Sequence, residues 1–504
     1  MNHILKLPLC FSLLISCFQS AISQLHYPDE RWPIGSNQFP GSDGYGNAWI
    51  HFQGDTITIE EAILNMDFES TVAVASNENG ELLFYSNGCE IRNANGELME
   101  NGEGLNPGPL HDWVCDGGYT VPKGMLALPL PDSPTKWLLL HTGGKYDPIN
   151  KLLYGPFYST EIDMGANNGQ GAVVSKNNIL SDKEIEPFAV VRHGNGRDWW
   201  VVVPEYTTNH YQVWLLDPTG ISLQTVQEIG PAIGCRRIGS SVFSQDGSKY
   251  ARTNNCSAVV LDFDRCGGVF SNPIPLERPP HTLGGGGLAF SDNNRWLYAT
   301  SQLCIFRADL ESNAPFLDSL FKQPYYEGVS DYVFGTSLAY MQWAPDGKVY
   351  MNAQHREKFL SAISLENDTF QYEQGILPLP VYAVRTLPNF PNFRLYDEQG
   401  SICDSLSIDG PPLSIHGPVF ANAGIFIYPN SAKDKLTIDS NQCKWQPSEI
   451  HIYDIYGREA LRLRHPEFIK IFTFNLPNIT PGIYWCKVSD GRSHHVFQKL
   501  SIVN

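Results

Sequence analysis

Short apolar strands alternate with turn-forming residues along most of this chain, and the spacing typical of amphipathic helices is almost absent. Residues 243–250 hold an aromatic strand end, an Asp-Gly turn and a second strand, and residues 290–298 and 343–350 repeat this pattern. Successive copies begin 47 and 53 residues apart. Strand–turn–strand units at about this spacing are typical of β-propeller blades.

Looser copies of the unit precede these three, near residues 78–85, 133–140 and 194–202. Together the copies predict six blades, near residues 71–99, 125–180, 187–229, 239–276, 287–322 and 338–377. A propeller ring must close, because unpaired blade edges would attract other strands. Residues 49–52 with 56–59, and residues 387–390, are spare strands that could share one further blade. We therefore predict an all-β fold with a β-propeller over residues 45–395, with seven blades preferred and six as the alternative.

The first 23 residues have the pattern of a secretory signal peptide. Lys6 precedes an apolar run over residues 7–18, and small residues occupy the cleavage positions at 21–23. The run is shorter than the roughly 20 residues that a membrane-spanning helix needs. Two alternatives stay open, an uncleaved N-terminal anchor and lipidation of Cys17. No other stretch approaches membrane-spanning length, so we expect no transmembrane segment in the mature chain.

Residues 425–504 carry a series of short motifs. They include Ile-Tyr-Pro-Asn at 427–430, Lys-Leu-Thr-Ile at 435–438, Ile-Tyr-Asp-Ile-Tyr-Gly-Arg at 452–458 and Lys-Leu-Ser-Ile at 499–502. Their order resembles the C-terminal sorting domain (type A) of proteins exported by the type IX secretion system of Gram-negative bacteria. The resemblance implies a small antiparallel β-sandwich and contact with the secretion machinery. It also implies export through the periplasm and outer membrane to the cell surface or medium, with removal of the domain on the way.

The body has a resemblance of its own, carried by residues 83–88, 95–99, 195–200, 262–265 and 387–393. These segments are similar to those of uncharacterised exported propellers that carry the same sorting domain. The resemblance implies a fold and a compartment, but it brings no known activity and no catalytic residue. Between body and sorting domain, residues 396–424 are rich in turn formers and lack periodicity, which predicts a linker.

The charge distribution excludes some partners. The net charge is −18, and the last 80 residues hold 10 basic against 7 acidic side chains, so the acidic excess lies in the body. A body that acidic repels nucleic acid and anionic lipid. We interpret it mainly as a solvated acidic surface. The sequence has no Cys-x-x-Cys pair and no Cys/His cluster at zinc spacing, so we expect no metal site and no cofactor.

The second strand of each predicted blade should end on one face, near the mouth of the central channel. Polar residues at these ends form a candidate ligand-binding ring, namely Asn87, His141, Glu205, Asn254, Gln302 and His355. Gly143 and Gly144 follow His141 and would let backbone approach a ligand closely. The alternative is that all of these are ordinary loop residues facing water.

Nine cysteines remain after the signal peptide, and this odd number leaves at least one unpaired. Export makes disulfides possible. We predict Cys235 with Cys256, with Cys304 as a rival partner. We also predict Cys89 with Cys115, and Cys443 with Cys486 inside the sorting domain.

These observations favour a recognition module for a glycan, a peptide or a surface protein. One alternative is a secreted hydrolase or lyase at the channel mouth, with His141, Glu205 and His355 as acid, base or metal ligands. The sequence carries no Gly-x-Ser-x-Gly or His-Glu-x-x-His motif in support of an enzyme. The other alternative is a structural or adhesive protein.

Overall fold

A computed structural model describes residues 26–502, apart from a set of gaps. The gaps are residues 37–40, 55, 148–150, 234–238, 255–256, 278–285, 323–337, 354–355, 365–369, 384, 399–400, 405, 407–424, 429–430, 434, 441–445, 455–457, 465, 467–468, 477–478, 481 and 490–494. The chain divides into two compact units, residues 1–410 and 411–504. We call the first unit the body.

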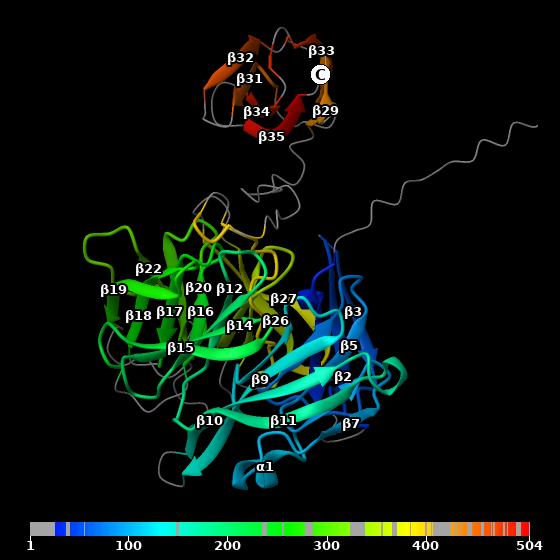
Figure 1. The fold of residues 1–504 in the computed structure, drawn as a ribbon, viewed down its shortest axis with the longest axis vertical. Helices are drawn as coiled ribbons and strands as arrows, with labels where there is room; N and C mark the ends of the chain where they lie inside the picture. Colours follow the sequence, from blue (N-terminus) through cyan, green and yellow to red (C-terminus); the bar gives the residue numbers. More distant parts are fainter. Residues whose placement is uncertain are drawn as a thin grey trace, which may run out of the picture. The chain divides into compact units, whose positions relative to one another are not determined.

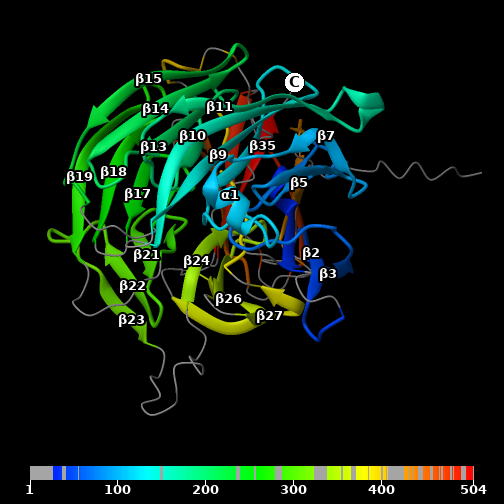
Figure 2. The same ribbon diagram turned by 90° about the horizontal axis from the view of Figure 1, so that it is seen from below.

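In the described residues, the strands of the body form seven antiparallel groups of three or four, arranged around an axis (Figures 1 and 2). We call them blades 1 to 7 in chain order. Blade 1 has three strands, β1 (Arg31–Ser36), β2 (Gly46–Gln53) and β3 (Thr56–Ala62). Blade 2 contains β4 (Ala73–Ser76), β5 (Leu82–Ser86), β6 (Glu90–Asn93) and β7 (Leu98–Glu103). Blade 3 contains β8 (Met125–Pro129), β9 (Lys136–Asp147), β10 (Lys151–Asp163) and β11 (Ala172–Ser181).

The remaining four blades have four strands each. Blade 4 contains β12 (Ala189–Arg192), β13 (Trp199–Pro204), β14 (His210–Asp217) and β15 (Gly220–Glu228). Blade 5 contains β16 (Ser240–Phe243), β17 (Lys249–Thr253), β18 (Ser257–Asp264) and β19 (Val269–Glu277). Blade 6 contains β20 (Leu288–Phe290), β21 (Trp296–Thr300), β22 (Cys304–Asp309) and β23 (Asp318–Lys322). Blade 7 contains β24 (Leu338–Trp343), β25 (Val349–Ala353), β26 (Glu357–Ser364) and β27 (Gln371–Ala383).

The repeated turn between the first and second strands explains the sequence repeat. In blade 5, Asp246 accepts the Ser248 backbone N–H at 2.9 Å, and Gly247 adopts a φ of +74°. The third copy has the same construction, with Asp346 accepting from Lys348 and Gly347 at a φ of +78°. The second copy uses Asn293 as the acceptor and Asn294 at a φ of +58°. A side-chain acceptor followed by a residue with positive φ is the chemistry of a tight turn, so Asp-Gly or Asn-Asn recurs at these copies.

The ring is closed by packing between neighbouring blades. Seven hydrophobic clusters of described residues each join two adjacent blades, including blade 7 with blade 1. In that closing cluster, Trp32 lies 4.8 Å from Phe52 and 6.0 Å from Tyr350 between ring centroids. Each such side chain contributes about 1.5–3 kcal/mol when fully buried. The β-propeller prediction is confirmed, with seven blades among the described residues.

Two expectations about the body need correction. Residues 387–390 form no strand, and blade 1 is instead built from the N-terminal strands β1 to β3 alone. The body also extends beyond 45–395 at both ends. Strand β1 precedes residue 45, and in the predicted linker Glu398 donates its backbone N–H to Gly194 O at 2.8 Å.

Blades 2 and 3 share a feature that ordinary blades lack. Their outer strands β7 and β11 pair in parallel at Glu100 and Ala172, which joins the two blades into one eight-stranded sheet. The described part of the body also contains a short helix, α1 (Pro109–Val114), and the 3₁₀ turns η1 (Pro28–Glu30) and η2 (Asn167–Gly169). None of the helices in the described part of the chain is long and apolar enough to cross a membrane.

The second unit is a small β-sandwich. One sheet contains β28 (Phe426–Tyr428), β30 (Lys435–Asp439) and β33 (Ile471–Asn475). The other contains β29 (Ser431–Ala432), β35 (His495–Ile502), β34 (Gly482–Ser489), β31 (Glu449–Asp454) and β32 (Glu459–Arg464). Leu436, Ile438, Ile450, Ile452 and Val488 are fully buried in its core. The expected sandwich is antiparallel except where β29 pairs in parallel with β35.

Candidate functional site

His141, the leading member of the predicted ring, is fully buried. Its Nδ1 lies 2.7 Å from Asn106 Oδ1 and its Nε2 lies 2.9 Å from Thr160 Oγ1. Asn106 Nδ2 donates to Gly88 O, so Asn106 Oδ1 faces the ring and can only accept; Nδ1 therefore carries the proton, and Nε2 accepts from the Thr160 hydroxyl. Burial lowers the pKa of His141 to about 3. The imidazole is therefore a neutral link between blades 2 and 3 and is not available as an acid, a base or a metal ligand at neutral pH.

Gly143 and Gly144 serve packing in the same region. A β-carbon on Gly144 would lie 2.3 Å from a Leu110 methyl group, and its backbone N–H donates to the Tyr119 hydroxyl at 2.7 Å. A β-carbon on Gly143 would meet the Tyr158 ring at 2.9 Å. Glycine is needed at both positions because other groups come close to the backbone there. These groups are side chains of the protein itself and not a ligand.

The other predicted ring residues also have partners within the body. Asn254 is fully buried and donates to Ile233 O at 3.0 Å. Glu205 accepts from Gln212 at 2.9 Å and lies 3.4 Å from His210. The backbone carbonyl of Gln302 accepts the Leu338 backbone N–H. His355 lies outside the described residues.

The channel that this ring was expected to surround is occupied by the chain itself. Phe390 packs against three hydrophobic clusters that are built from blades 1, 2, 3, 4 and 7. The same segment is hydrogen-bonded on two sides, through Pro388 O to Lys123 before blade 3 and through Phe390 O to Gln342 of blade 7. Leu387 and Phe393, on either side, are 2% and 3% exposed. The segment that was predicted to be a strand therefore fills the channel.

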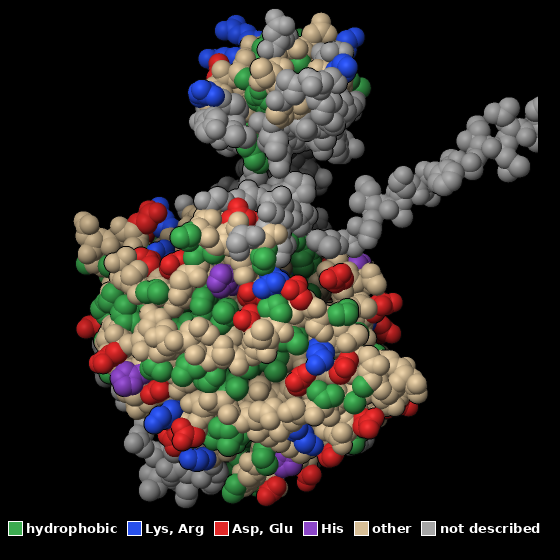
Figure 3. All heavy atoms as spheres, viewed as in Figure 1, with side chains coloured by type: hydrophobic (Ala, Val, Ile, Leu, Met, Phe, Trp, Pro, Cys, Tyr) green, Lys and Arg blue, Asp and Glu red, His purple; other side chains and the backbone are tan. Residues whose placement is uncertain are grey.

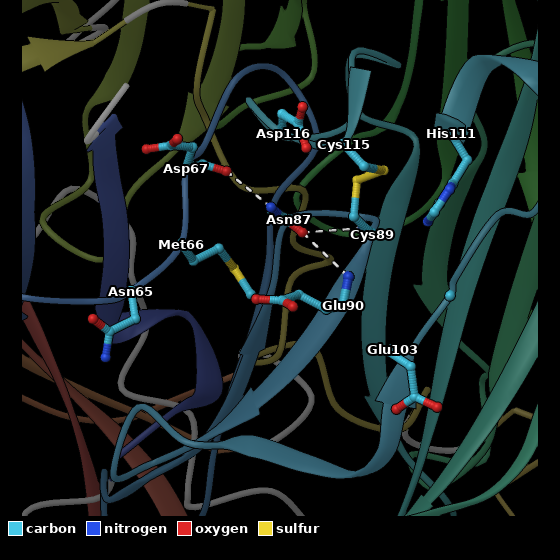
Figure 4. A pocket seen from close by; sticks show the side chains of 11 residues that line it. Asn65, Met66, Asp67, Asn87, Cys89, Glu90, Glu103, His111, Cys115 and Asp116 are labelled. Atoms are coloured by element: carbon cyan, nitrogen blue, oxygen red, sulfur yellow. Dashed lines mark hydrogen bonds between the residues drawn. A yellow bond between two sulfur atoms is a disulfide. The ribbon is translucent and has the colours of Figure 1, made fainter. Parts of the chain in front are cut away.

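A cavity of about 400 Å³ lies instead at the rim of blade 2, and we call it the rim cavity (Figure 4). It is lined by Asn65, Met66, Asp67, Asn87, Cys89, Glu90, Glu103, Gly104, His111, Cys115 and Asp116. The lining comes from the loop before β4, the strands β6 and β7, and helix α1 with the residues that follow it. Asn87 is the one predicted ring residue among them.

Local hydrogen bonds shape the rim cavity. Asn87 Oδ1 accepts the backbone N–H groups of Cys89 and Glu90, at 3.0 and 3.3 Å, and its Nδ2 donates to Asp67 O at 3.0 Å (Figure 4). The Cys89–Cys115 disulfide ties α1 to this loop, which confirms that predicted pair. The frame is therefore fixed, while Asp116 and Glu103 are exposed to solvent. Sequence reasoning missed this cavity because its walls come from segments that are contiguous only in the folded protein.

The remaining cysteine predictions have mixed outcomes. Cys486 is a free, buried thiol, so the predicted bond to Cys443 is wrong, because Cys486 points into the apolar sandwich core. Cys304 is also free and buried, so it is not a rival partner. Cys235, Cys256 and Cys443 lie outside the described residues. An unpredicted disulfide joins Cys266 to Cys403.

The geometry for a metal site is poor. Among the described residues, Cys266, Glu398 and Cys403 are the one group of ligand atoms close enough to share an ion. The two thiols of this group form the disulfide, which leaves one carboxylate. The rim-cavity carboxylates do not come together in this way.

Comparisons with known proteins identify the second unit. Residues 426–503 match the secretion system C-terminal sorting domain. They mark the protein for export by the type IX secretion system to the cell surface or the extracellular space, and the predicted sorting domain is confirmed. A search of curated proteins finds no match.

The body is similar to several crystal structures at low identity. One is a protein from Lactobacillus plantarum, with 12% identity, a TM-score of 0.46, and coverage of 70% of this chain and 98% of that chain. Another is a putative 6-phosphogluconolactonase from Bacteroides fragilis, with 10% identity, a TM-score of 0.43, and coverage of 70% and 97%. A β-propeller domain from Myceliophteria thermophila has 10% identity, a TM-score of 0.35, and coverage of 64% and 91%. Likenesses at this level say nothing about activity.

Proposed function

We propose that the body is an extracellular recognition module that binds a glycan in the rim cavity. The observation that carries the proposal is the contrast in availability of polar groups. His141 and Asn254 are buried and bonded within the body, whereas Asp116 and Glu103 are exposed at a cavity of about 400 Å³. Cavities of roughly 300–1,000 Å³ are typical of small-ligand sites.

The chemistry of the lining supports a ligand rich in hydroxyl groups. Asp67, Glu90, Glu103 and Asp116 bring four carboxylates to the lining, and Asn65 adds an amide. Glu90 Oε1 already accepts from Arg92 Nε at 2.7 Å and Glu103 Oε1 lies 3.7 Å from Lys176 Nζ, so each of these two keeps its second oxygen for a ligand. Ionised carboxylates only accept hydrogen bonds, and sugar hydroxyls are the matching donors. Met66 and the Cys89–Cys115 disulfide supply a smaller apolar wall for the carbon face of a ring.

The hydrolase or lyase alternative loses support from the same facts. His141 has both ring nitrogens engaged, and Glu205 holds Gln212 and lies beside His210. Neither side chain is placed to exchange protons with a substrate in the channel, because residues 387–393 fill it.

The proposal is tested by a glycan array followed by calorimetry on the exported protein. Asp116→Asn with Glu103→Gln should weaken binding at least tenfold, which corresponds to about 1.4 kcal/mol. Glu277→Gln, an exposed carboxylate on blade 5, is the matched control and should leave binding unchanged. No glycan binding by the wild type would refute the proposal. Binding that disappears with added salt would instead indicate a cationic peptide, because salt screens exposed charges.

A further inference from the structure

Residues 385–398 run through the ring from one face to the other. They enter on the face where the second strands end, which we call the second-strand face. There, Arg385 donates its backbone N–H to Ala353 O at 3.1 Å, at the end of β25. The Thr386 hydroxyl donates to Glu69 O at 2.7 Å, just before blade 2 begins. The entry is therefore fixed to blades 7 and 2 at once.

In the middle of the ring, one buried lysine holds the segment. Lys123 Nζ donates to Pro388 O at 2.8 Å and to Gln342 Oε1 at 2.7 Å. Asn389 Nδ2 donates back to Lys123 O at 3.2 Å. Lys123 precedes blade 3 and Gln342 belongs to blade 7, so the lysine reaches across the axis and the segment lies between them. Apolar and polar contacts therefore alternate along the segment, and we call this set of contacts its seat.

The segment leaves on the opposite face, which carries the turns between first and second strands. There, Asn392 Nδ2 donates to Gln245 O in the blade 5 turn at 2.8 Å. The Phe393 ring lies 5.6 Å from the Trp199 ring in blade 4. Arg265, which is 4% exposed, donates to the Tyr396 carbonyl.

A covalent bond closes this exit. Cys403 is bonded to Cys266 in the turn between β18 and β19, and the two cysteines are 137 residues apart in the sequence. The sorting domain begins after this bond along the chain. A pull on the chain from the sorting domain reaches Cys403 first. The disulfide passes that load to blade 5, so the residues inside the ring do not bear it.

We propose that residues 385–398 are a plug that stays in the mature body, and that the Cys266–Cys403 disulfide is a latch that holds the plug during export and after the sorting domain is removed. The plug closes the channel to ligands. The latch lies between the plug and the sorting domain, so force applied to the sorting domain by the secretion machinery does not reach the plug.

Hydrogen exchange on the full chain tests both parts. The wild-type peptide covering 385–398 should exchange at least tenfold more slowly than the same peptide in the unfolded chain. Cys266→Ser with Cys403→Ser should raise that exchange about tenfold, whereas Cys89→Ser with Cys115→Ser, the matched control, should change it less than twofold. Exchange at the unfolded rate in the wild type would overturn the plug, and unchanged exchange in the Cys266/Cys403 variant would overturn the latch.

A second measurement covers the case in which the Cys266/Cys403 variant does not fold. Reductant is added to a folded variant that carries Cys89→Ser and Cys115→Ser together with Cys235→Ser and Cys256→Ser, so that neither the rim disulfide nor the predicted Cys235–Cys256 bond can respond and the latch is opened. The same increase in exchange at 385–398 is expected, and its absence would overturn the latch. Lys123→Met should raise the exchange of this peptide with the disulfide intact, and no increase would contradict the seat that Lys123 provides.

Discussion

The filled channel and the rim cavity contain similar polar side chains in opposite circumstances. In and around the channel, Lys123 and Asn254 are buried and bonded to the protein's own backbone. At the rim of blade 2, Asp116 and Glu103 face solvent on a frame fixed by a disulfide. Burial separates the two regions more than the lack of a partner does, since Glu103 also lies 3.7 Å from Lys176 Nζ yet stays exposed. The acidic side chains on the face in Figure 3 are scattered, which agrees with a generally solvated surface.

The largest expected effect concerns a buried ion pair between blades 4 and 5. Arg252 and Glu186 are 0% and 1% exposed, with Nε and Oε2 3.5 Å apart. Arg252→Met leaves a buried carboxylate without its partner and should cost about 3–5 kcal/mol of unfolding free energy at pH 8. Adding Glu186→Gln should restore most of the loss, as measured by urea unfolding. Two additive losses would contradict the pairing.

The pH dependence of that variant sharpens the comparison. Burial raises the pKa of Glu186 to about 7 even beside Arg252. Since the folded pKa lies above the ordinary value of 4.5, this group favours folding at low pH and loses that contribution as pH rises from 4.5 through 7. The penalty of Arg252→Met should therefore be smaller at pH 5 than at pH 8.

The two described disulfides should differ in their contribution to stability. The Cys266–Cys403 pair closes the longer loop, with separations of 137 against 26 residues. In the chain-entropy account, each contributes about 2–4 kcal/mol, more for the longer loop. Thermal unfolding of the two double serine variants should show the larger loss for Cys266/Cys403. The reverse order would mean that the rim frame, and not the plug, is the more constrained region.

His141 gives a smaller effect with a definite sign. Its folded pKa of about 3 lies below the ordinary value of 6.5, so the unfolded state takes up a proton that the folded state refuses. Stability is lost as pH falls from 6.5 toward 3, at up to about 1.4 kcal/mol per pH unit. His141→Gln should unfold with a shallower acid dependence than the wild type. An identical dependence would mean that His141 is not held neutral.

The smallest effect on stability is expected at the rim cavity. Asp116→Asn and Glu103→Gln change exposed side chains, and such substitutions are usually within about 0.5 kcal/mol. Melting temperatures should therefore match the wild type even where binding is lost. A large drop in melting temperature would show that these carboxylates are structural.

Much of the fold could be predicted from the sequence, because turns with Asp-Gly or Asn-Asn are local chemistry and recur in blades 5, 6 and 7. The order of motifs in residues 425–504 likewise carried the sorting domain. The prediction of a strand at residues 387–390 was wrong, because an apolar run suits both a strand and an irregular segment at the axis of a ring. Which of the two forms depends on the path of the chain in the folded protein. The Cys266–Cys403 bond was missed for the same reason.

The candidate site was less accessible to prediction. Strand order does put Asn87 and His141 at strand ends, but it cannot tell that Asn106 and Thr160 satisfy the imidazole. Of the described ring residues, Asn87 lines the rim cavity, and there it shapes the wall through its bonds to the backbone.

Ligand titration by calorimetry on two variants tests the central claim most directly, once an array has supplied a glycan. The account predicts that Asp116→Asn with Glu103→Gln weakens binding at least tenfold while His141→Gln binds like the wild type. Loss of binding in His141→Gln, with full binding in the rim-cavity variant, would contradict it.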